Sequence, residues 1–207
     1  MVPQRTRNGH PVRTGPNVMP GPSSTYIAYG KSWANVSNTP FRMYKHYNHE
    51  GGISTPLIAH WPKGINAKNE FSDQPGHLID IMATCVDLAG ADYPKSFNGR
   101  AIQPMEGQSL SPTFNSNINR ERVLLWEHFR NRAIRRGKWK LVAVNRNTSR
   151  KDYTVGWELY NIEEDRSEMN DLSEKYPEKA KELKDLWYKH AWRTYIYPKP
   201  GTARKEK

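Results

Sequence analysis

The second half of the chain alternates short apolar runs with polar turns. The runs at 123–126, 132–134 and 139–144 are rich in Val, Ile, Leu and Trp and have the length of strands. Gly137 lies between the second and third runs, where a tight hairpin turn favours glycine. A further run at 156–161 completes a pattern that predicts a small antiparallel sheet.

A segment near the C-terminus repeats its apolar residues with helical spacing. It extends from Pro177 to about Trp192, and proline is well placed in a first helical turn. Its apolar positions share one face and are Ala180, Leu183, Trp187 and Ala191. We expect this helix to pack on the sheet.

A second helix is predicted between Pro75 and Gly90, where the glycine supplies a stop. Its apolar face consists of Leu78, Ile81, Met82, Cys85 and Ala89, and the opposite stripe of Asp80, Thr84 and Asp87. Cys85, the only cysteine in the chain, is therefore interpreted as a small buried hydrophobe. A single cysteine also excludes an internal disulfide.

The first sixty residues follow no long period. Residues 1–24 are rich in proline and glycine and are interpreted as an irregular arm. A short aromatic segment from residue 25 to 33 is compatible with a turn or a short helix. Residues 55–61 form a compact apolar run closed by Pro62, and its shortness and flanking prolines favour a buried strand over a helix.

Charge and hydropathy restrict the classes of function. The 207 residues carry a net charge of +11 and are 36% hydrophobic, and no apolar run reaches the length of about 18 residues that a membrane span requires. Nine of the eleven net charges lie between residues 115 and 151. An ordinary solvated strand face and a surface that attracts sulfated polysaccharide both fit this distribution, whereas nucleic-acid binding is disfavoured because no recognised motif accompanies it.

The most informative segment is 38–62, which gathers Arg42, Lys45, His46 and His49 ahead of a Glu50-Gly51-Gly52 turn. It closely resembles the sulfatase family, arylsulfatase-like and formylglycine-dependent, in the segment where a lysine reaches the sulfate of the substrate. Lys45 falls on that lysine. The resemblance continues through residues 77–80, 139–141 and 157–161, so it covers nearly the whole chain but only the second half of the family.

The resemblance implies an α/β fold. Residues 1–117, including the arm, would be the end of an alkaline-phosphatase-like α/β sulfatase domain. Residues 118–207 would be the family's C-terminal subdomain, an antiparallel sheet with a packed helix. The family's Cys-x-Pro-x-Arg nucleophile motif, oxidised to formylglycine, and its Asp-Asp and Asp-Asn calcium ligands are absent from the sequence. We therefore expect the C-terminal part of a sulfatase, from a truncated, split or partial gene, with calcium belonging to the parent family.

The candidate site residues are Lys45, His49 and His128. A lysine suits sulfate because its compact ammonium approaches a tetrahedral anion as a point charge; without the resemblance, Lys45 would be read as a surface lysine. His46 and His49 could line the sugar side of the pocket or could fix the turn by hydrogen bonding. His128 follows Trp126-Glu127, a segment that in related sulfatases can face the cleft, although Phe129-Arg130 replaces the Glu-Gly of many relatives.

Two hypotheses about function remain. In the first, the chain is part of a sulfatase whose substrate is a sulfated small molecule or polysaccharide and whose partner is the missing N-terminal half. It would then be inactive alone, with no nucleic acid and no membrane involved. In the second, it is a non-enzymatic basic module that binds sulfated glycan or another polyanion. The sequence shows no signal peptide, and the sulfatases that it resembles are commonly periplasmic, secreted or lysosomal, so the compartment is left open.

Overall fold

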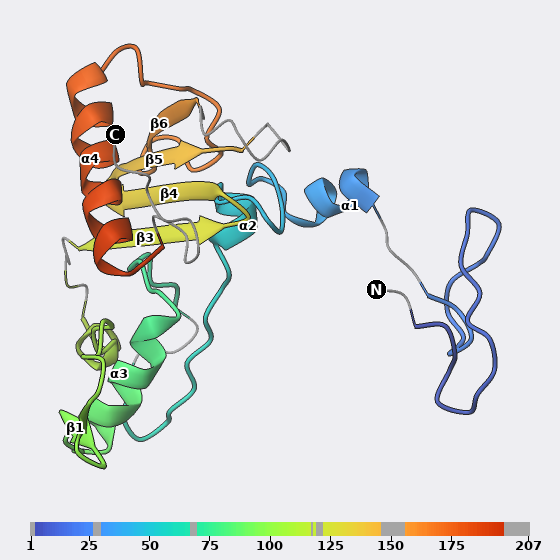
Figure 1. The fold of residues 1–207 in the computed structure, drawn as a ribbon, viewed down its shortest axis with the longest axis horizontal. Coiled ribbons are helices and arrows are strands. Elements are labelled where there is room, and N and C mark those ends of the chain that lie inside the picture. The colour runs from blue at the N-terminus through green and yellow to red at the C-terminus, as the bar shows by residue number, and fades with distance from the viewer. Residues whose placement is uncertain are drawn as a thin grey trace.

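A computed structural model describes residues 3–26, 30–66, 70–116, 118, 122–145 and 156–196. Its helices are α1 (Gly30–Ser37), α2 (Glu50–Ile53), α3 (Ile79–Leu88) and α4 (Pro177–Arg193), with a 3-10 turn at Ser111–Thr113. Its strands are β1 (Ser96–Phe97), β2 (Arg100–Ala101), β3 (Val123–His128), β4 (Asn131–Arg136), β5 (Trp139–Ala143) and β6 (Trp157–Asn161). Figure 1 shows the larger sheet beside α4, with α3 and the β1–β2 hairpin below it.

The larger sheet is an antiparallel meander in the order β3-β4-β5-β6, as the apolar runs predict. Its register places Leu125 opposite Ile134, Ile134 opposite Leu141 and Leu141 opposite Leu159, so four apolar side chains form one row across the sheet. Gly137 turns the β4–β5 hairpin with a φ of +55°, a conformation that glycine adopts without a steric penalty. The predicted hairpin is confirmed.

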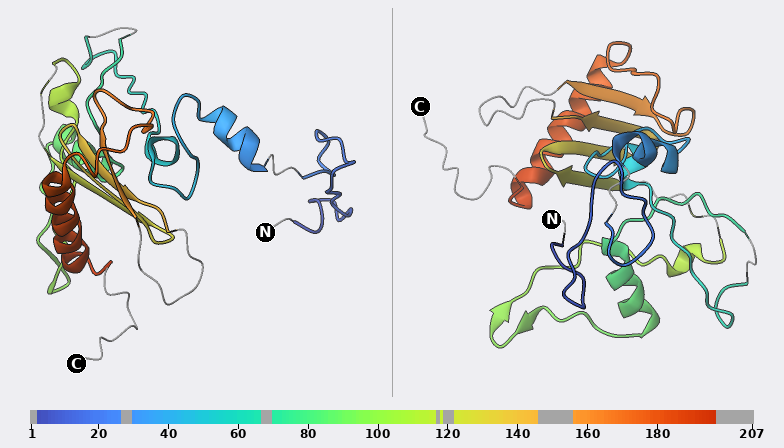
Figure 2. Two further views of the ribbon diagram at one scale, coloured as in Figure 1. Left: turned by 90° about the horizontal axis from the view of Figure 1, so that it is seen from above. Right: turned by 90° about the vertical axis from the view of Figure 1, so that its right-hand side faces the viewer.

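Helix α4 covers one face of this sheet (Figure 2, left). The helical spacing predicted the packed face correctly, because Leu183, Trp187 and Ala191 are at most 1% exposed. They pack against Ile134, Leu141 and Leu159 of the sheet. This layer contains the larger of the two clusters of buried apolar residues in the described structure. Each large apolar side chain buried in it contributes about 1.5–3 kcal/mol to stability.

The opposite face of the sheet is covered by the segment that contains α2 (Figure 2, left). Because side chains alternate along a strand, this face receives Ala133, Val142 and Tyr160, which are buried together with Ile162. It also receives Lys140, whose side chain is 0% exposed. The basic region at 115–151 is therefore not simply a solvated strand face. Lys140 and Arg132 are buried, and the Arg122 side chain is 7% exposed.

Helix α3 forms where the sequence predicts it, but it buries its polar stripe and exposes its apolar face. Asp80 and Thr84 on the polar stripe are buried, whereas Ile81 and Met82 on the apolar face are 45% and 59% exposed. Cys85 is exposed, so its interpretation as a buried hydrophobe is wrong. The reason is that residues 107–111 occupy the polar side and satisfy its hydrogen-bonding groups.

The predicted strand at 55–61 is also wrong. These residues pair with no strand among the residues that the structure describes, and Leu57 and Ile58 are 61% and 90% exposed. In the arm, residues 3–26 contain only two isolated bridges, Arg5 with Pro11 and Arg13 with Thr25, which fits the expected irregular conformation. The division at 117 and 118 stays a prediction. No helix in the described ranges is long and apolar enough to cross a membrane.

Candidate functional site

Lys45 lies at the tip of the loop that precedes α2. Its side chain is exposed and has no hydrogen bond or ion pair with any other residue that the structure describes. Met43 and His46, on either side, have φ values of +67° and +86°. Non-glycine residues rarely adopt this conformation, and it persists only where the surroundings hold it. The anchors of this loop therefore decide where the ammonium of Lys45 is presented.

The first anchor is the close packing of the Glu-Gly-Gly turn under the loop. The N–H of Gly51 donates to the carbonyl of Arg42 at 2.9 Å. A Cβ atom at Gly51 would lie 2.2 Å from the Met43 oxygen, and one at Gly52 would lie 2.0 Å from the Tyr47 oxygen. The glycine pair is therefore required because the backbone of the loop leaves no room for a side chain at either position.

Gly52→Ala is accordingly expected to destabilise the fold, although alanine favours a helix more than glycine does. The added methyl group overlaps the backbone oxygen of Tyr47, which no rotamer change can move, so a cost of about 1–3 kcal/mol is expected. Gly76→Ala is the matched control, because its methyl group would meet only the Leu110 methyls at 3.9 and 4.0 Å. Equal denaturation midpoints for the two variants would contradict this explanation.

The second anchor is a buried ion cluster formed by Lys140, Glu50 and Glu168. The Nζ atom of Lys140 lies 2.7 Å from Oε1 of Glu50 and 2.8 Å from Oε1 of Glu168. The contact between Lys140 and Glu168 is an ion pair without the geometry of a hydrogen bond. The Oε2 atom of Glu168 accepts a hydrogen bond from the backbone N–H of Glu50 at 2.7 Å. Burial favours the neutral form of Glu50, but Lys140 and nearby arginines outweigh it and lower its pKa. Glu50 thus ties the turn to the sheet.

The third anchor is Arg42, at the start of the loop. Its Nη1 atom donates to the Tyr160 hydroxyl at 2.8 Å and to the Glu168 carbonyl at 2.9 Å. The same nitrogen lies 3.5 Å from a carboxylate oxygen of Glu158. Arg42 therefore connects the loop to β6 and to the segment after it.

His49 lies within this buried network and not at the surface. Its side chain is 0% exposed, and Nε2 lies 3.1 Å from Oε2 of Glu158, which also accepts from the Tyr160 hydroxyl at 2.8 Å. The hydrogen bond from His49 is the main cause of a Glu158 pKa of about 2. Of the two roles considered for His49, this placement supports fixing the turn. Its Nδ1 atom is buried and finds no partner among the described residues.

The low pKa of Glu158 predicts a loss of stability in acid. Because the folded value of about 2 lies below the ordinary 4.5, the carboxylate stabilises the fold above pH 4.5, and this contribution disappears as the pH falls toward 2. Glu158→Gln should flatten that part of the stability curve. Denaturant melts at pH 5, 4 and 3 measure it, and equal slopes for wild type and variant would contradict the assignment.

His128 is brought to the Lys45 loop by the β3–β4 hairpin. Its Nε2 atom lies 3.3 Å from Nδ1 of His46, the residue after Lys45, and the two rings are stacked with centroids 5.4 Å apart. The hairpin turns on Phe129 and Arg130, both with positive φ, and the edge of Phe129 packs against both histidines. Asn131 adds a hydrogen bond of 2.7 Å from its side-chain nitrogen to the His46 carbonyl.

Sequence reasoning named Lys45, His49 and His128 but missed Arg42, Glu158 and Tyr160 as their supports. Glu158 and Tyr160 lie more than one hundred positions after the Arg42 and His49 side chains that they contact, and nothing in local spacing indicates that they meet. One signal was available. Lys140 lies on the same face of β5 as the apolar Val142, opposite the face of Leu141. A charged residue at a position where the strand pattern expects burial indicates a buried ion pair.

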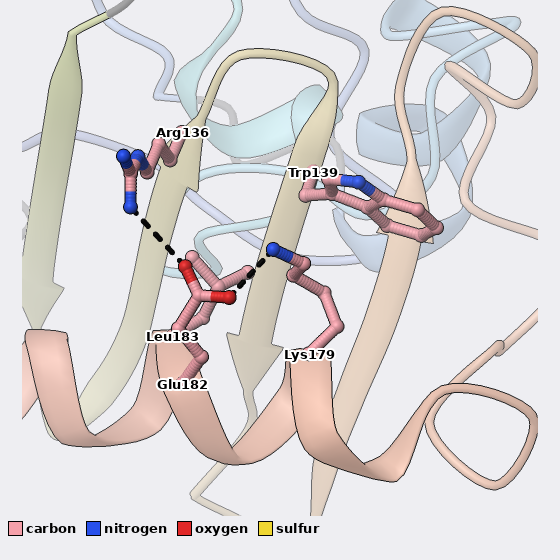
Figure 3. Close-up of a pocket in the computed structure, with 5 residues that line it drawn as sticks. All are labelled: Arg136, Trp139, Lys179, Glu182 and Leu183. Carbon is pink, nitrogen blue, oxygen red and sulfur yellow. Dashed lines mark hydrogen bonds and ion pairs between the residues drawn. The ribbon is translucent and has the colours of Figure 1, made fainter.

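The described residues contain no group of three or more acidic, histidine or cysteine side chains that could hold a metal ion. They therefore do not supply a set of ligands for the calcium that the resemblance implies. A shallow pocket lies on the α4 side, lined by Arg136, Trp139, Lys179, Glu182 and Leu183 (Figure 3). It is on the opposite face from Lys45, and Glu182 engages both Arg136 and Lys179.

Comparison with known proteins places these features in a family. The family described as "N-sulphoglucosamine sulphohydrolase, C-terminal" matches residues 39–191, which include the loop, the sheet and most of α4. An uncharacterized sulfatase of Schizosaccharomyces pombe is 29% identical over 184 residues, covering 87% of this chain and 32% of the relative. An arylsulfatase of Klebsiella aerogenes is 35% identical over 92 residues, covering 44% of this chain and 20% of that protein.

Solved structures agree with the family match. The crystal structure of Ps i-CgsB in complex with k-i-k-neocarrahexaose has a TM-score of 0.60 and 28% identity, over 75% of this chain and 32% of that one. The chain therefore spans about a third of the length of the first of these relatives and of this solved structure. Its four-stranded antiparallel sheet with a C-terminal helix matches the C-terminal part of such structures, and the chain belongs to the sulfatase family as its C-terminal region.

Proposed function

We propose that this chain supplies the sulfate-binding lysine of a sulfatase active site, and that this lysine is Lys45. The observation that carries the proposal is the contrast between the tip of the loop and its base. The ammonium is exposed and unpaired among the described residues, whereas the backbone on either side is anchored by buried ion pairs and hydrogen bonds. This arrangement presents the ammonium at a defined place and leaves it free of a counter-charge among the described residues.

The chemistry explains why a positioned cation is useful. Cleaving a sulfate monoester requires an oxygen nucleophile at sulfur and positive charge beside the sulfuryl oxygens, and that charge is effective when it is placed before the reaction begins. Lys45 can contribute the charge. Neither the nucleophile motif nor the calcium-binding pairs of the family occur in the 207 residues, so those parts of the reaction belong to residues outside this sequence.

His128 and His46 form the neighbouring wall of the proposed site. Their stacked rings and Phe129 provide flat surfaces with ring nitrogens at their edges, a composition that suits a sugar with hydroxyl groups. We propose a sulfated carbohydrate as the substrate class. The relative solved with k-i-k-neocarrahexaose supports this class, and the fold of the matched region supports a place at the end of an alkaline-phosphatase-like α/β domain. His49, which is fully buried, acts here as a support of the loop and does not touch the substrate.

The isolated chain is expected to hydrolyse no aryl sulfate, because it lacks both the nucleophile and the calcium ligands. The assay measures release of sulfate and of the aryl alcohol by the purified chain, with and without calcium. Calcium-stimulated turnover would contradict the proposal that the nucleophile and the calcium ligands come from residues outside this sequence. The role of Lys45 itself is tested in a chimera that places this chain behind the upstream part of the S. pombe sulfatase, in the position of its matched C-terminal region.

A further inference from the structure

Two hairpins of this chain have the same turn conformation but very different turn residues. The β1–β2 hairpin turns on Asn98 and Gly99, whose φ values are +47° and +74°. The β3–β4 hairpin turns on Phe129 and Arg130, whose φ values are nearly the same, +48° and +69°. Positive φ at both residues of a two-residue loop is the pattern of a type I′ turn, and Asn-Gly is its preferred sequence. The β1–β2 turn therefore has residues that suit its backbone, and the β3–β4 turn does not.

The residues of the β3–β4 turn cost the fold stability. At positive φ a side chain brings its Cβ atom too close to the following carbonyl oxygen, a penalty that glycine escapes and asparagine tolerates best. The β4–β5 hairpin also places a glycine, Gly137, at its positive-φ position. Phe129 and Arg130 adopt this conformation without either remedy. Backbone strain of this kind persists only where the surroundings hold it, and it is concentrated at sites that bind ligands.

Contacts within the hairpin and to the Lys45 loop hold the strained turn. The N–H of Arg130 donates to Oε1 of Glu127 at 2.8 Å. Asn131, the first residue after the turn, donates from its side chain to the carbonyl of His46 at 2.7 Å. Figure 1 shows this end of β3 and β4 beside α2. The turn is therefore fixed to the loop that carries Lys45, at the residue next to it.

The ring of Phe129 remains largely in solvent in spite of this fixation. Its centroid lies 4.8 Å from that of His46 and 4.5 Å from that of His128, with the ring planes inclined at 72° and 69°. The residue is nevertheless 65% exposed. A phenylalanine that served only to pack the hairpin against the loop would be mostly buried, and a smaller residue would form the turn with less strain. Packing alone therefore does not explain the phenylalanine.

An exposed aromatic ring beside a sulfate-binding lysine suits a sugar. The C–H groups of a pyranose ring form an apolar face that can stack on an aromatic side chain, while its hydroxyl groups stay at the rim. A ring that is already fixed loses little freedom when it binds, which gives the strained turn a use.

We propose that Phe129 is a specificity-determining residue, which stacks on a sugar unit next to the unit whose sulfate Lys45 binds. The inference rests on the proposed function of Lys45 and deepens it. The preferred substrate is then a sulfate ester within an oligosaccharide, and not the sulfate ester of a single sugar.

The experiment uses the full 207-residue chain and two probes, inorganic sulfate and k-i-k-neocarrahexaose, the sugar of the solved relative. NMR titrations follow the backbone amide signals of the β3–β4 turn and of the Lys45 loop. The hexasaccharide should shift both sets of signals, whereas sulfate should shift only those of the loop. Phe129→Asn should weaken binding of the hexasaccharide about fivefold, because it removes the stacking surface, and should leave sulfate binding unchanged.

Two control variants isolate the ring. Arg130→Gly removes the neighbouring cation but keeps Phe129, so it should retain hexasaccharide binding. Phe97→Ala removes a phenylalanine that is 69% exposed beside the Asn-Gly turn, and it should retain binding too. Stability should change in the opposite direction to binding. Phe129→Asn and Arg130→Gly should each raise the melting temperature by about 2–4 °C, because each relieves strain at positive φ.

Four results would overturn the inference. They are the absence of hexasaccharide-dependent shifts at the turn of the unsubstituted chain, wild-type binding by Phe129→Asn, an equal loss of binding in Arg130→Gly, which would assign the effect to charge, and a lower melting temperature of Phe129→Asn, which would assign the ring to packing. The role of Lys45 is measured separately. Sulfate binding that is unchanged in Lys45→Ala would refute the sulfate-binding lysine, while a loss of hexasaccharide binding in Phe129→Asn would still support stacking on Phe129.

Discussion

Lys140→Ala should be among the most destabilising single substitutions in the sheet. The side chain is 0% exposed and neutralises two carboxylates that are themselves at most 5% exposed, Glu50 and Glu168. Removing the cation leaves two carboxylates in the interior, where Glu50 keeps only a 3.5 Å ion pair with the half-exposed Arg166. Breaking a buried ion pair in this way costs about 3–5 kcal/mol. A fall in the melting temperature on the order of 10 °C follows for a chain of this size.

The control for this prediction is Lys181→Ala, which removes a lysine that is 71% exposed from an ion pair with Asp185 on the surface of α4. Exposed pairs of this kind contribute little, so its melting temperature should be close to wild type. A second variant isolates the cause. Combining Lys140→Met with Glu50→Gln and Glu168→Gln removes all three charges and should recover much of the loss. If the triple variant melts as low as Lys140→Ala, lost packing and not uncompensated charge is responsible.

Lys45→Ala in the chimera with the S. pombe upstream part should leave the fold intact but lower kcat about a hundredfold. A positioned cation aimed at the transferring sulfuryl group contributes on the order of 3 kcal/mol to the transition state, and that energy corresponds to this factor in rate. Lys45→Arg should recover only part of the activity, because the planar guanidinium is bulkier and displaces the sulfate from its line with the nucleophile.

The measurement compares kcat and KM of both variants with those of the unsubstituted chimera on an aryl sulfate, after melts show that all three are equally stable. Lys181→Ala, on α4 and therefore on the far side of the sheet, serves as the control for loss of positive charge. Unchanged turnover in Lys45→Ala would make Lys45 an ordinary surface lysine, and the proposed function would be withdrawn.

Sequence patterns predicted the part of the fold in which local periodicity and burial agree. The alternation in β3 to β6 and the helical spacing of Leu183, Trp187 and Ala191 both place apolar residues on the faces that the structure buries. Family resemblance, and not periodicity, pointed to Lys45. Its loop could not have been derived from spacing, because its conformation depends on partners more than one hundred residues away, such as Tyr160 and Glu168.

The errors have a common physical origin. Periodicity shows which residues share a face, but it does not show what covers that face. In α3 the polar stripe is buried because Arg122 and residues 107–111 satisfy its hydrogen-bonding groups, while the apolar face is exposed. The run at 55–61 was read as a buried strand for the same reason, since its apolar content indicated burial without specifying a partner.

Lys140 also fixes the register in which β5 pairs with its neighbours during folding. Successive side chains on a strand point to opposite faces, so a slip of one residue in β5 would move Lys140 to the apolar layer of α4 and Leu141 to the two carboxylates. Both exchanges are unfavourable, the first because a lone ammonium would enter an apolar environment. An interior made only of aliphatic residues on both faces would tolerate that slip far better. The buried lysine thus disfavours hairpins with a shifted register. Variants that lose it should populate alternative strand pairings and should also have a lower melting temperature.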